Sequence, residues 1–213
     1  MGFPNIDKIL IKMFLAGFNG LKADPSPLLD IFDDFDEADL AQVAHYITRK
    51  RYNADLRDHE EGQVYIVGSF PRADMMFPQI TVNLGEDNSD RYMGDSTGES
   101  IPVLDGDDNL IAHDIVKGYY GKSHWLINII AATKDETIWL SRCCQYFICL
   151  GMLELAQKGM NEIDIAMADL RPDQQQLPME VFNRAIKITG VTENTWKVRV
   201  PVYDYTTGTN LAL

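Results

Sequence analysis

The chain has 213 residues, of which 46% are hydrophobic, so it can bury one full core without disulfides or metal ions. Its formal net charge of -13 would repel the phosphates of double-stranded DNA over most of the surface, which argues against a sequence-reading nucleic-acid binder. We expect a single domain that spans residues 1–213, with segments that project from it.

Cysteine usage and the N-terminal residues indicate where the protein is made. The chain has an odd number of cysteines, and all three fall in one apolar helical stretch: Cys143, Cys144 and Cys149. We therefore expect these cysteines to be reduced core residues of a cytosolic protein. The apolar run from Ile9 to Ile11 is bounded by lysines, is too short to span a membrane, and does not resemble a signal peptide. We therefore expect an unexported protein without a membrane partner.

Residues 1–55 are predicted to form an N-terminal helical segment. Apolar side chains repeat at helical spacing from Ile6, with Asn5 as a possible cap, and Gly17 and Gly20 are expected to end this first helix. After a turn rich in proline and aspartate, residues 36–52 have one apolar face and one charged face, which predicts a second helix.

The next part of the chain is predicted to be extended. Residues 63–68 and 79–84 are rich in β-branched residues and favour two strands. Residues 85–121 are dotted with glycines and mostly acidic, which predicts a protruding insertion that is either an extended loop or a hairpin. Connections of this length are usually functional or disordered.

The second half is predicted to begin with an apolar strand over residues 124–132. Thr133 to Glu136 then fit a capping box that opens the longest helix, which we expect to end near Gly159. This helix is apolar on two stripes, so we expect one side to pack on a sheet and the other on a second surface. The first stripe contains Leu140, Cys143, Phe147 and Leu150, and the second contains Trp139, Tyr146, Cys149 and Leu153.

Three further strands are predicted over residues 163–167, 180–189 and 195–205, with a turn at residues 190–194 between the last two. The complete pattern predicts an α+β fold. Its mostly antiparallel sheet would pack against one long helix, with N-terminal helices and a long projecting acidic loop or hairpin.

No motif for catalysis, metal binding or cofactor binding is complete. Asp105, Asp107 and Asn109 resemble the start of a calcium loop, but Leu110 replaces the required glycine and Val116 the bidentate glutamate, which favours a solvated acidic loop. The four histidines are scattered, and the phosphate-loop, dinucleotide and nucleophile-elbow patterns are missing. We therefore expect no enzyme activity, cofactor or metal, and cysteines that are packed rather than activated.

Aromatic and basic residues near the long insertion form a candidate contact patch, because tyrosine and arginine contribute most to interface hot spots. The alternative is a loop that is anchored by its own tyrosines. The candidate residues are Arg91, Tyr92, Lys117, Tyr119 and Tyr120, together with Tyr203 and Tyr205 near the end of the last strand.

The chain resembles the tail-terminator proteins of long-tailed bacteriophages at Phe77-Pro78-Gln79-Ile80-Thr81-Val82 and the following Gly85-Glu86, where a strand leads into an acidic projecting segment. The order of the later elements is also similar to that family: an apolar strand, a helix start at Thr133, one long helix, and a terminal strand ending in aromatic residues. The resemblance covers residues 64–205. The chain differs from the compact members of that family in its two predicted N-terminal helices and in its larger insertion.

The resemblance implies an α+β subunit of a ring, expected to be hexameric, that closes the tail tube and joins it to the head connector. It implies a place in the neck of the virion after assembly in the bacterial host cytoplasm, with tail-tube and neck proteins as partners. DNA would only pass through the lumen, where an acidic wall would let it slide. Two alternatives stay open: another head-tail connector or stopper protein, and a soluble intracellular α+β enzyme or ligand-binding protein with an unidentified site.

Overall fold

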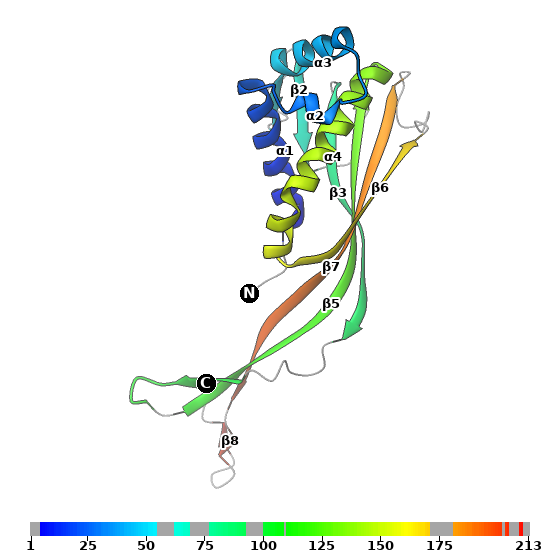
Figure 1. Ribbon diagram of the computed structural model, residues 1–213. Coiled ribbons are helices and arrows are strands. Elements are labelled where there is room, and N and C mark those ends of the chain that lie inside the picture. Colours follow the sequence, from blue (N-terminus) through cyan, green and yellow to red (C-terminus); the bar gives the residue numbers. More distant parts are fainter. Residues whose placement is uncertain are drawn as a thin grey trace.

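The computed structural model describes residues 5–54, 62–68, 77–92, 100–108, 110–170, 181–201, 203–204 and 209–210. It has an α+β fold in which helices cover one face of a long sheet, and part of the sheet extends well beyond them (Figure 1). The helices are α1 (Ile6–Ala23), α2 (Leu28–Ile31), α3 (Glu37–Arg49) and α4 (Lys134–Gln157). The strands are β1 (Arg51–Asn53), β2 (Gln63–Val67), β3 (Gln79–Tyr92), β4 (Ser100–Leu104), β5 (Leu110–Ala131), β6 (Met160–Leu170), β7 (Phe182–Pro201), β8 (Tyr203–Asp204) and β9 (Thr209–Asn210).

The strands of the main sheet follow the order β1-β2-β3-β5-β7-β6, and β4 also pairs with β5. The β1–β2 and β2–β3 pairs are parallel, whereas the pairs that involve β5 or β7 are antiparallel. The short strands β8 and β9 pair with each other as a separate hairpin. The prediction of a mostly antiparallel sheet packed against one long helix is confirmed.

Side-chain caps begin the three longer helices. Asn5, Asp36 and Thr133 each accept a hydrogen bond from the backbone N–H three residues later. A cap of this kind satisfies one of the donors that the first helical turn leaves unpaired. The predicted starts of α1, α3 and α4 are therefore confirmed, whereas the short helix α2 was not predicted.

The core lies between the helices and the sheet. Ile6, Leu10, Phe14, Phe18 and Leu21 recur at helical spacing along α1 and are buried. They pack with the buried face of α4 and with apolar residues of the central strands in one continuous cluster. Because a helix and a sheet each have one apolar face to cover, this two-layer packing buries both.

The predicted end of the first helix near Gly17 is wrong, since α1 continues to Ala23. A Cβ atom at Gly17 would lie 2.7 Å from the ring of Phe147 on α4. Glycine at this position therefore allows α1 and α4 to approach closely, and it does not break the helix. Its usual cost within a helix, about 0.5–1 kcal/mol relative to alanine, is offset by the packing of the Phe147 ring.

The two glycines of α1 give a matched pair of substitutions. Gly17→Ala is expected to lower the free energy of unfolding by about 1–3 kcal/mol, because the added methyl group would overpack the Phe147 contact. Gly20→Ala is expected to be neutral or to stabilise by up to about 1 kcal/mol, because nothing lies within 4 Å of an added Cβ there. Urea unfolding followed by circular dichroism would measure both, and equal effects at the two sites would contradict this packing.

The second half of the sheet also differs from prediction. The expected turn at residues 190–194 is wrong, because β7 runs without interruption from Phe182 to Pro201 and pairs with β5 along its whole length. A Cβ at Gly190 would lie 2.5 Å from the side chain of Met160, so this glycine makes room for a neighbouring strand. Residues 85–121 are likewise mostly strand, formed by the ends of β3 and β5 together with β4, so the hairpin alternative is correct for the described part.

Candidate functional site

The β ribbon is the part of the sheet that extends beyond the helices, and it consists of β4, residues 110–122 of β5 and residues 191–201 of β7. In Figure 1 it leaves the body as a long, twisted extension that curves below the helical layer. The turn between β4 and β5 begins at Asp105, whose carboxylate accepts a hydrogen bond from the backbone N–H of Asp107 at 2.9 Å. The calcium-like motif of the sequence is therefore the end of a hairpin.

Most of the predicted contact patch maps to the base of the ribbon. In the register of β3 and β5, Arg91 lies opposite Tyr120, and Tyr92 lies opposite Tyr119. Lys117 is also on β5, two residues before Tyr119. Five of the seven candidate residues therefore share one region of the sheet. Of the other two, Tyr203 belongs to β8, and Tyr205 lies outside the described residues.

One face of the ribbon continues the face that the helices cover in the body. Side chains alternate between the two faces of a strand, and the pairing of β5 with β7 has no register shift that would change this alternation. In the body this face contains Trp125, Ile127, Ile129, Ile186 and Ile188, which are all buried.

The same alternation places His113 and Lys117 of the ribbon on this face, and with them the apolar residues Ile111, Ile115, Val198 and Val200. We call these four residues the apolar ribbon face. Val200 is 41% exposed and the other three are partly exposed. Among the described residues, the helices lie over the body and not over the ribbon (Figure 1). An apolar sheet face that no helix covers is unusual in an isolated domain and marks a surface for another molecule.

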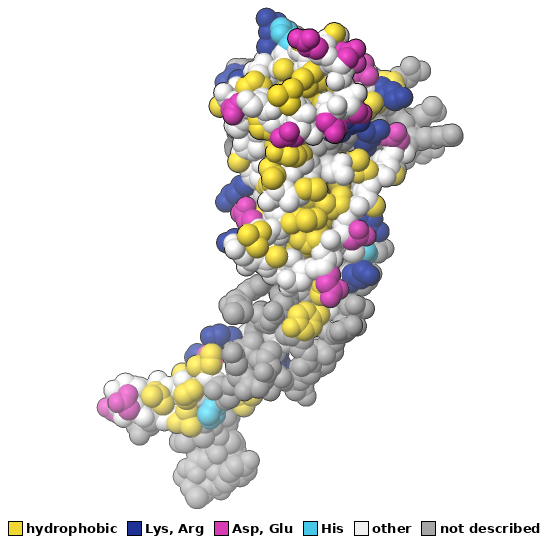
Figure 2. Space-filling view, viewed as in Figure 1, with side chains coloured by type: hydrophobic (Ala, Val, Ile, Leu, Met, Phe, Trp, Pro, Cys, Tyr) yellow, Lys and Arg dark blue, Asp and Glu magenta, His cyan; other side chains and the backbone are white. Residues whose placement is uncertain are grey.

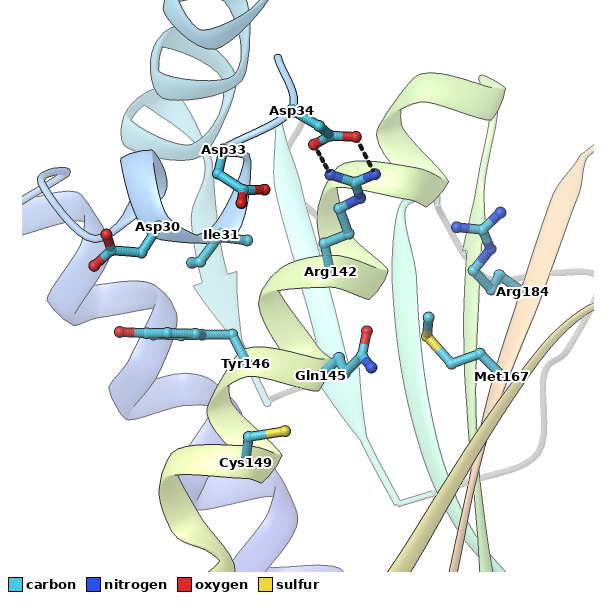
Figure 3. Close-up of a pocket in the computed structure, with 10 residues that line it drawn as sticks. All are labelled: Asp30, Ile31, Asp33, Asp34, Arg142, Gln145, Tyr146, Cys149, Met167 and Arg184. Carbon is cyan, nitrogen blue, oxygen red and sulfur yellow. Dashed lines mark hydrogen bonds and ion pairs between the residues drawn. The ribbon is translucent and has the colours of Figure 1, made fainter.

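A groove of about 640 Å³ lies on the outer side of α4, away from the ribbon. Figure 3 shows side chains from successive turns of α4 along it, with the segment around α2 on one side and β6 and β7 on the other. The lining residues are Asp30, Ile31, Asp33, Asp34, Arg142, Gln145, Tyr146, Cys149, Met167 and Arg184. We call this surface the α4 groove.

Two bidentate ion pairs hold the basic side chains of the α4 groove. Arg142 donates to both carboxylate oxygens of Asp34, and its guanidinium lies 5.1 Å from the centre of the Phe35 ring. Arg184 of β7 donates to both oxygens of Asp169 at 2.6 and 3.2 Å. Forked pairing of this kind fixes the guanidinium orientation, so the rims of the groove are preorganised.

The Asp34 pair predicts a pH dependence. The hydrogen bond from Arg142 holds the pKa of Asp34 below its ordinary value. Because the folded-state pKa is lowered, the pair's contribution is present above the unfolded carboxyl value of about 3.9 and is lost as pH falls through the folded pKa. NMR titration should find that Arg142→Gln raises the pKa of Asp34, and an unchanged value would contradict the pairing.

Below the ion pair, the outer side of α4 is apolar and exposed. Leu150 and Leu153 are 66% and 71% exposed, and Cys149 and Tyr146 lie on the same side of the helix. Figure 2 shows hydrophobic side chains gathered over this middle part of the body and again along the ribbon. The prediction of a second apolar side of this helix is correct, although Leu150 belongs to the exposed side and not to the buried stripe.

The three cysteines have different environments. Cys143 and Cys144 are completely buried, and burial raises the pKa of both thiols, whereas Cys149 is exposed in the α4 groove. The prediction that all three are core residues is therefore wrong for Cys149. The raised pKa values disfavour a thiolate nucleophile at Cys143 or Cys144.

We expect one thiol per chain to react rapidly with Ellman's reagent in the native protein, and all three to react in guanidinium chloride. Cys149→Ser should remove the fast reaction, because its thiol alone among the three is exposed. Fast reaction of more than one thiol in the native protein, or of any thiol in the folded Cys149→Ser variant, would contradict the burial of Cys143 and Cys144.

Within the described ranges, no group of three histidine, cysteine, aspartate or glutamate side chains could hold a metal ion. His124 belongs to β5, and its Nδ1 atom lies 3.0 Å from the hydroxyl of Thr189 on β7. No helix in the described part of the chain is both long enough and apolar enough to cross a membrane.

Comparison with known proteins identifies no relative: no family model matches the chain, and no curated protein matches it.

Proposed function

We propose that this protein is a structural subunit of the bacteriophage neck, namely the tail terminator, which caps the tail tube as a ring and joins it to the head connector. The observation that carries the proposal is the β ribbon with its exposed apolar face. Such a ribbon extends far from the body's own core and gains a second layer when it meets another subunit.

Ring formation is supported by two different exposed surfaces on the same chain. A closed ring of identical subunits needs a head-to-tail interface, in which one patch of each copy meets a different patch of the next. The apolar ribbon face and the α4 groove are such a pair of patches. They are formed by separate parts of the molecule, so one subunit could contact a neighbour on each side (Figure 1).

The charge of the chain also suits a channel for DNA. With a net charge of -13, the wall of the ring would attract the duplex weakly or repel it, so DNA could move through the lumen. The partners in this proposal are further copies of the chain, the tail tube and the head-connector proteins.

The proposal is tested by separating heads, tails and joined particles from cells infected with a phage that lacks this gene. We expect free heads and free tails of irregular length, because an uncapped tube can continue to grow. Plasmid-encoded wild-type protein should restore joined particles. Normal tail length with unjoined heads would instead assign the chain to a connector or stopper, and normal virions would refute a role in the neck.

A further inference from the structure

We propose that the outer part of the β ribbon pivots relative to the body at a two-stranded segment of β5 and β7. We call this segment, residues 116–118 of β5 with residues 195–197 of β7, the waist. The outer part, which we call the distal ribbon, consists of β4, residues 110–115 of β5 and residues 198–201 of β7. This movement belongs to the single chain and does not depend on the proposed ring.

The width of the sheet changes abruptly along β5. At Lys122 four strands lie side by side, from β3 through β5 and β7 to β6. On one side of the waist, β3 ends at Tyr92, opposite Tyr119 of β5. On the other side, β4 begins its pairing with β5 at Ser100, opposite Ile115. Between these two points, the sheet formed by the described residues is only two strands wide.

A narrow sheet bends and twists more easily than a broad one. Each additional strand adds a ladder of hydrogen bonds that a bend must distort, and two strands by themselves are only marginally stable. The body is stiffened further by its helices, whose buried residues form one cluster with β5 that ends at Trp125. Among the described residues, no helix lies over the waist (Figure 1). The waist is therefore the most easily deformed part of the long sheet.

The sequence of the waist adds to this freedom. Gly118 lies at its body end, paired with Thr195 of β7. A glycine within a strand has no side chain to pack along the ladder and has a wider choice of backbone angles, so it weakens the strand at that point. The register of β5 with β7 is continuous through the waist, so the movement would bend and twist the ribbon without breaking this pairing.

The pivot would carry a complete surface with it. All four residues of the apolar ribbon face lie in the distal ribbon, where β4 adds a third strand beside β5 and β7. The distal ribbon would therefore move as a unit and present this face over a range of angles. Hinge movement of one rigid part on another is a recurrent form of conformational change in proteins.

Distances between pairs of spin labels test the pivot. Cys149→Ser removes the exposed native thiol, and the two buried cysteines would stay unlabelled. Lys12→Cys then places a label on an exposed position of α1. Its partner is either Lys122→Cys, exposed on the body side of the waist, or Val200→Cys, which replaces a 41% exposed residue of the distal ribbon. Double electron–electron resonance of the monomer, isolated by size-exclusion chromatography, gives the distribution of each distance.

We expect the distances between Lys12 and Val200 to be distributed at least about twice as widely as those between Lys12 and Lys122, because only the first pair spans the waist. A third variant combines Lys12→Cys with Ile101→Cys on β4. It should give the same broad distribution as Val200, because β4 moves together with β5 and β7. Circular dichroism should show the same helix content in all three variants.

Every other pattern of widths would overturn the pivot. Narrow distributions for both Lys122 and Val200 would mean that the ribbon is a rigid extension of the body. Broad distributions for both would place the movement on the body side of Lys122. A broad distribution for Ile101 alone would mean that β4 detaches while β5 and β7 stay fixed.

Discussion

Deleting residues 95–108 is expected to abolish the joining of phage heads to tails while the body of the subunit stays folded. The deletion removes β4 and the acidic turn. Because Tyr92 pairs with Tyr119, nine residues along β5 from Leu110, the shortened connection also draws the first residues of β5 away from β7. The pairing of β5 with β7 in the body and the helical layer stay in place. A neck that depends on the ribbon would then lose one of its two contact surfaces. Electron microscopy of lysates, with circular dichroism of the purified variant, would measure both parts of this expectation.

Asp108→Asn is the matched control for the deletion. Asp108 has a φ of 62°, a conformation that asparagine also adopts readily, so this change should preserve the turn and remove one charge. Joining should be near normal in this variant. If heads and tails also join normally after the deletion, the end of the ribbon is a passive hairpin and its assigned role is wrong.

Replacing Phe18 by alanine is expected to lower the free energy of unfolding by about 3–5 kcal/mol, the range for deletion of a buried aromatic ring. Phe18 is completely buried. Its ring stacks on Tyr52 with centroids 4.4 Å apart and meets the edge of Phe147 at 5.1 Å. The substitution would open a cavity where α1, α4 and the strand edge meet.

Leu29→Ala is the control for that cavity, because Leu29 is 61% exposed on α2. Its effect should stay within about 0.5 kcal/mol, as for most surface substitutions. Denaturant unfolding of both variants gives the comparison. A loss below about 1 kcal/mol for Phe18→Ala would contradict the packing of α1 described above.

Local patterns in the sequence predicted the helix starts and the strand cores well. Asn5, Asp36 and Thr133 act as caps through bonds to residues three positions away, so their role is visible in a short window. The two glycine errors have a different origin. Gly17 and Gly190 leave room for the side chains of Phe147 and Met160. These partners are distant in the sequence, so no local pattern could distinguish a glycine in close packing from a glycine in a turn.

The candidate site was only partly predictable. The aromatic and basic residues around Tyr120 predicted a contact patch, and the apolar periodicity of the long helix predicted a second contact side. The α4 groove was missed because it combines Asp34, Arg142 and Arg184 from three distant segments. The apolar ribbon face was missed because its strand alternation was hidden by the predicted turn at residues 190–194.

The most direct test of the account is a single-particle reconstruction of the neck of a virion that contains this chain. The account predicts a closed ring of copies between the tail tube and the head connector, with the β ribbon of each copy in contact with a neighbouring copy. An isolated copy that touches no other copy of itself, or a neck built without this chain, would contradict the account.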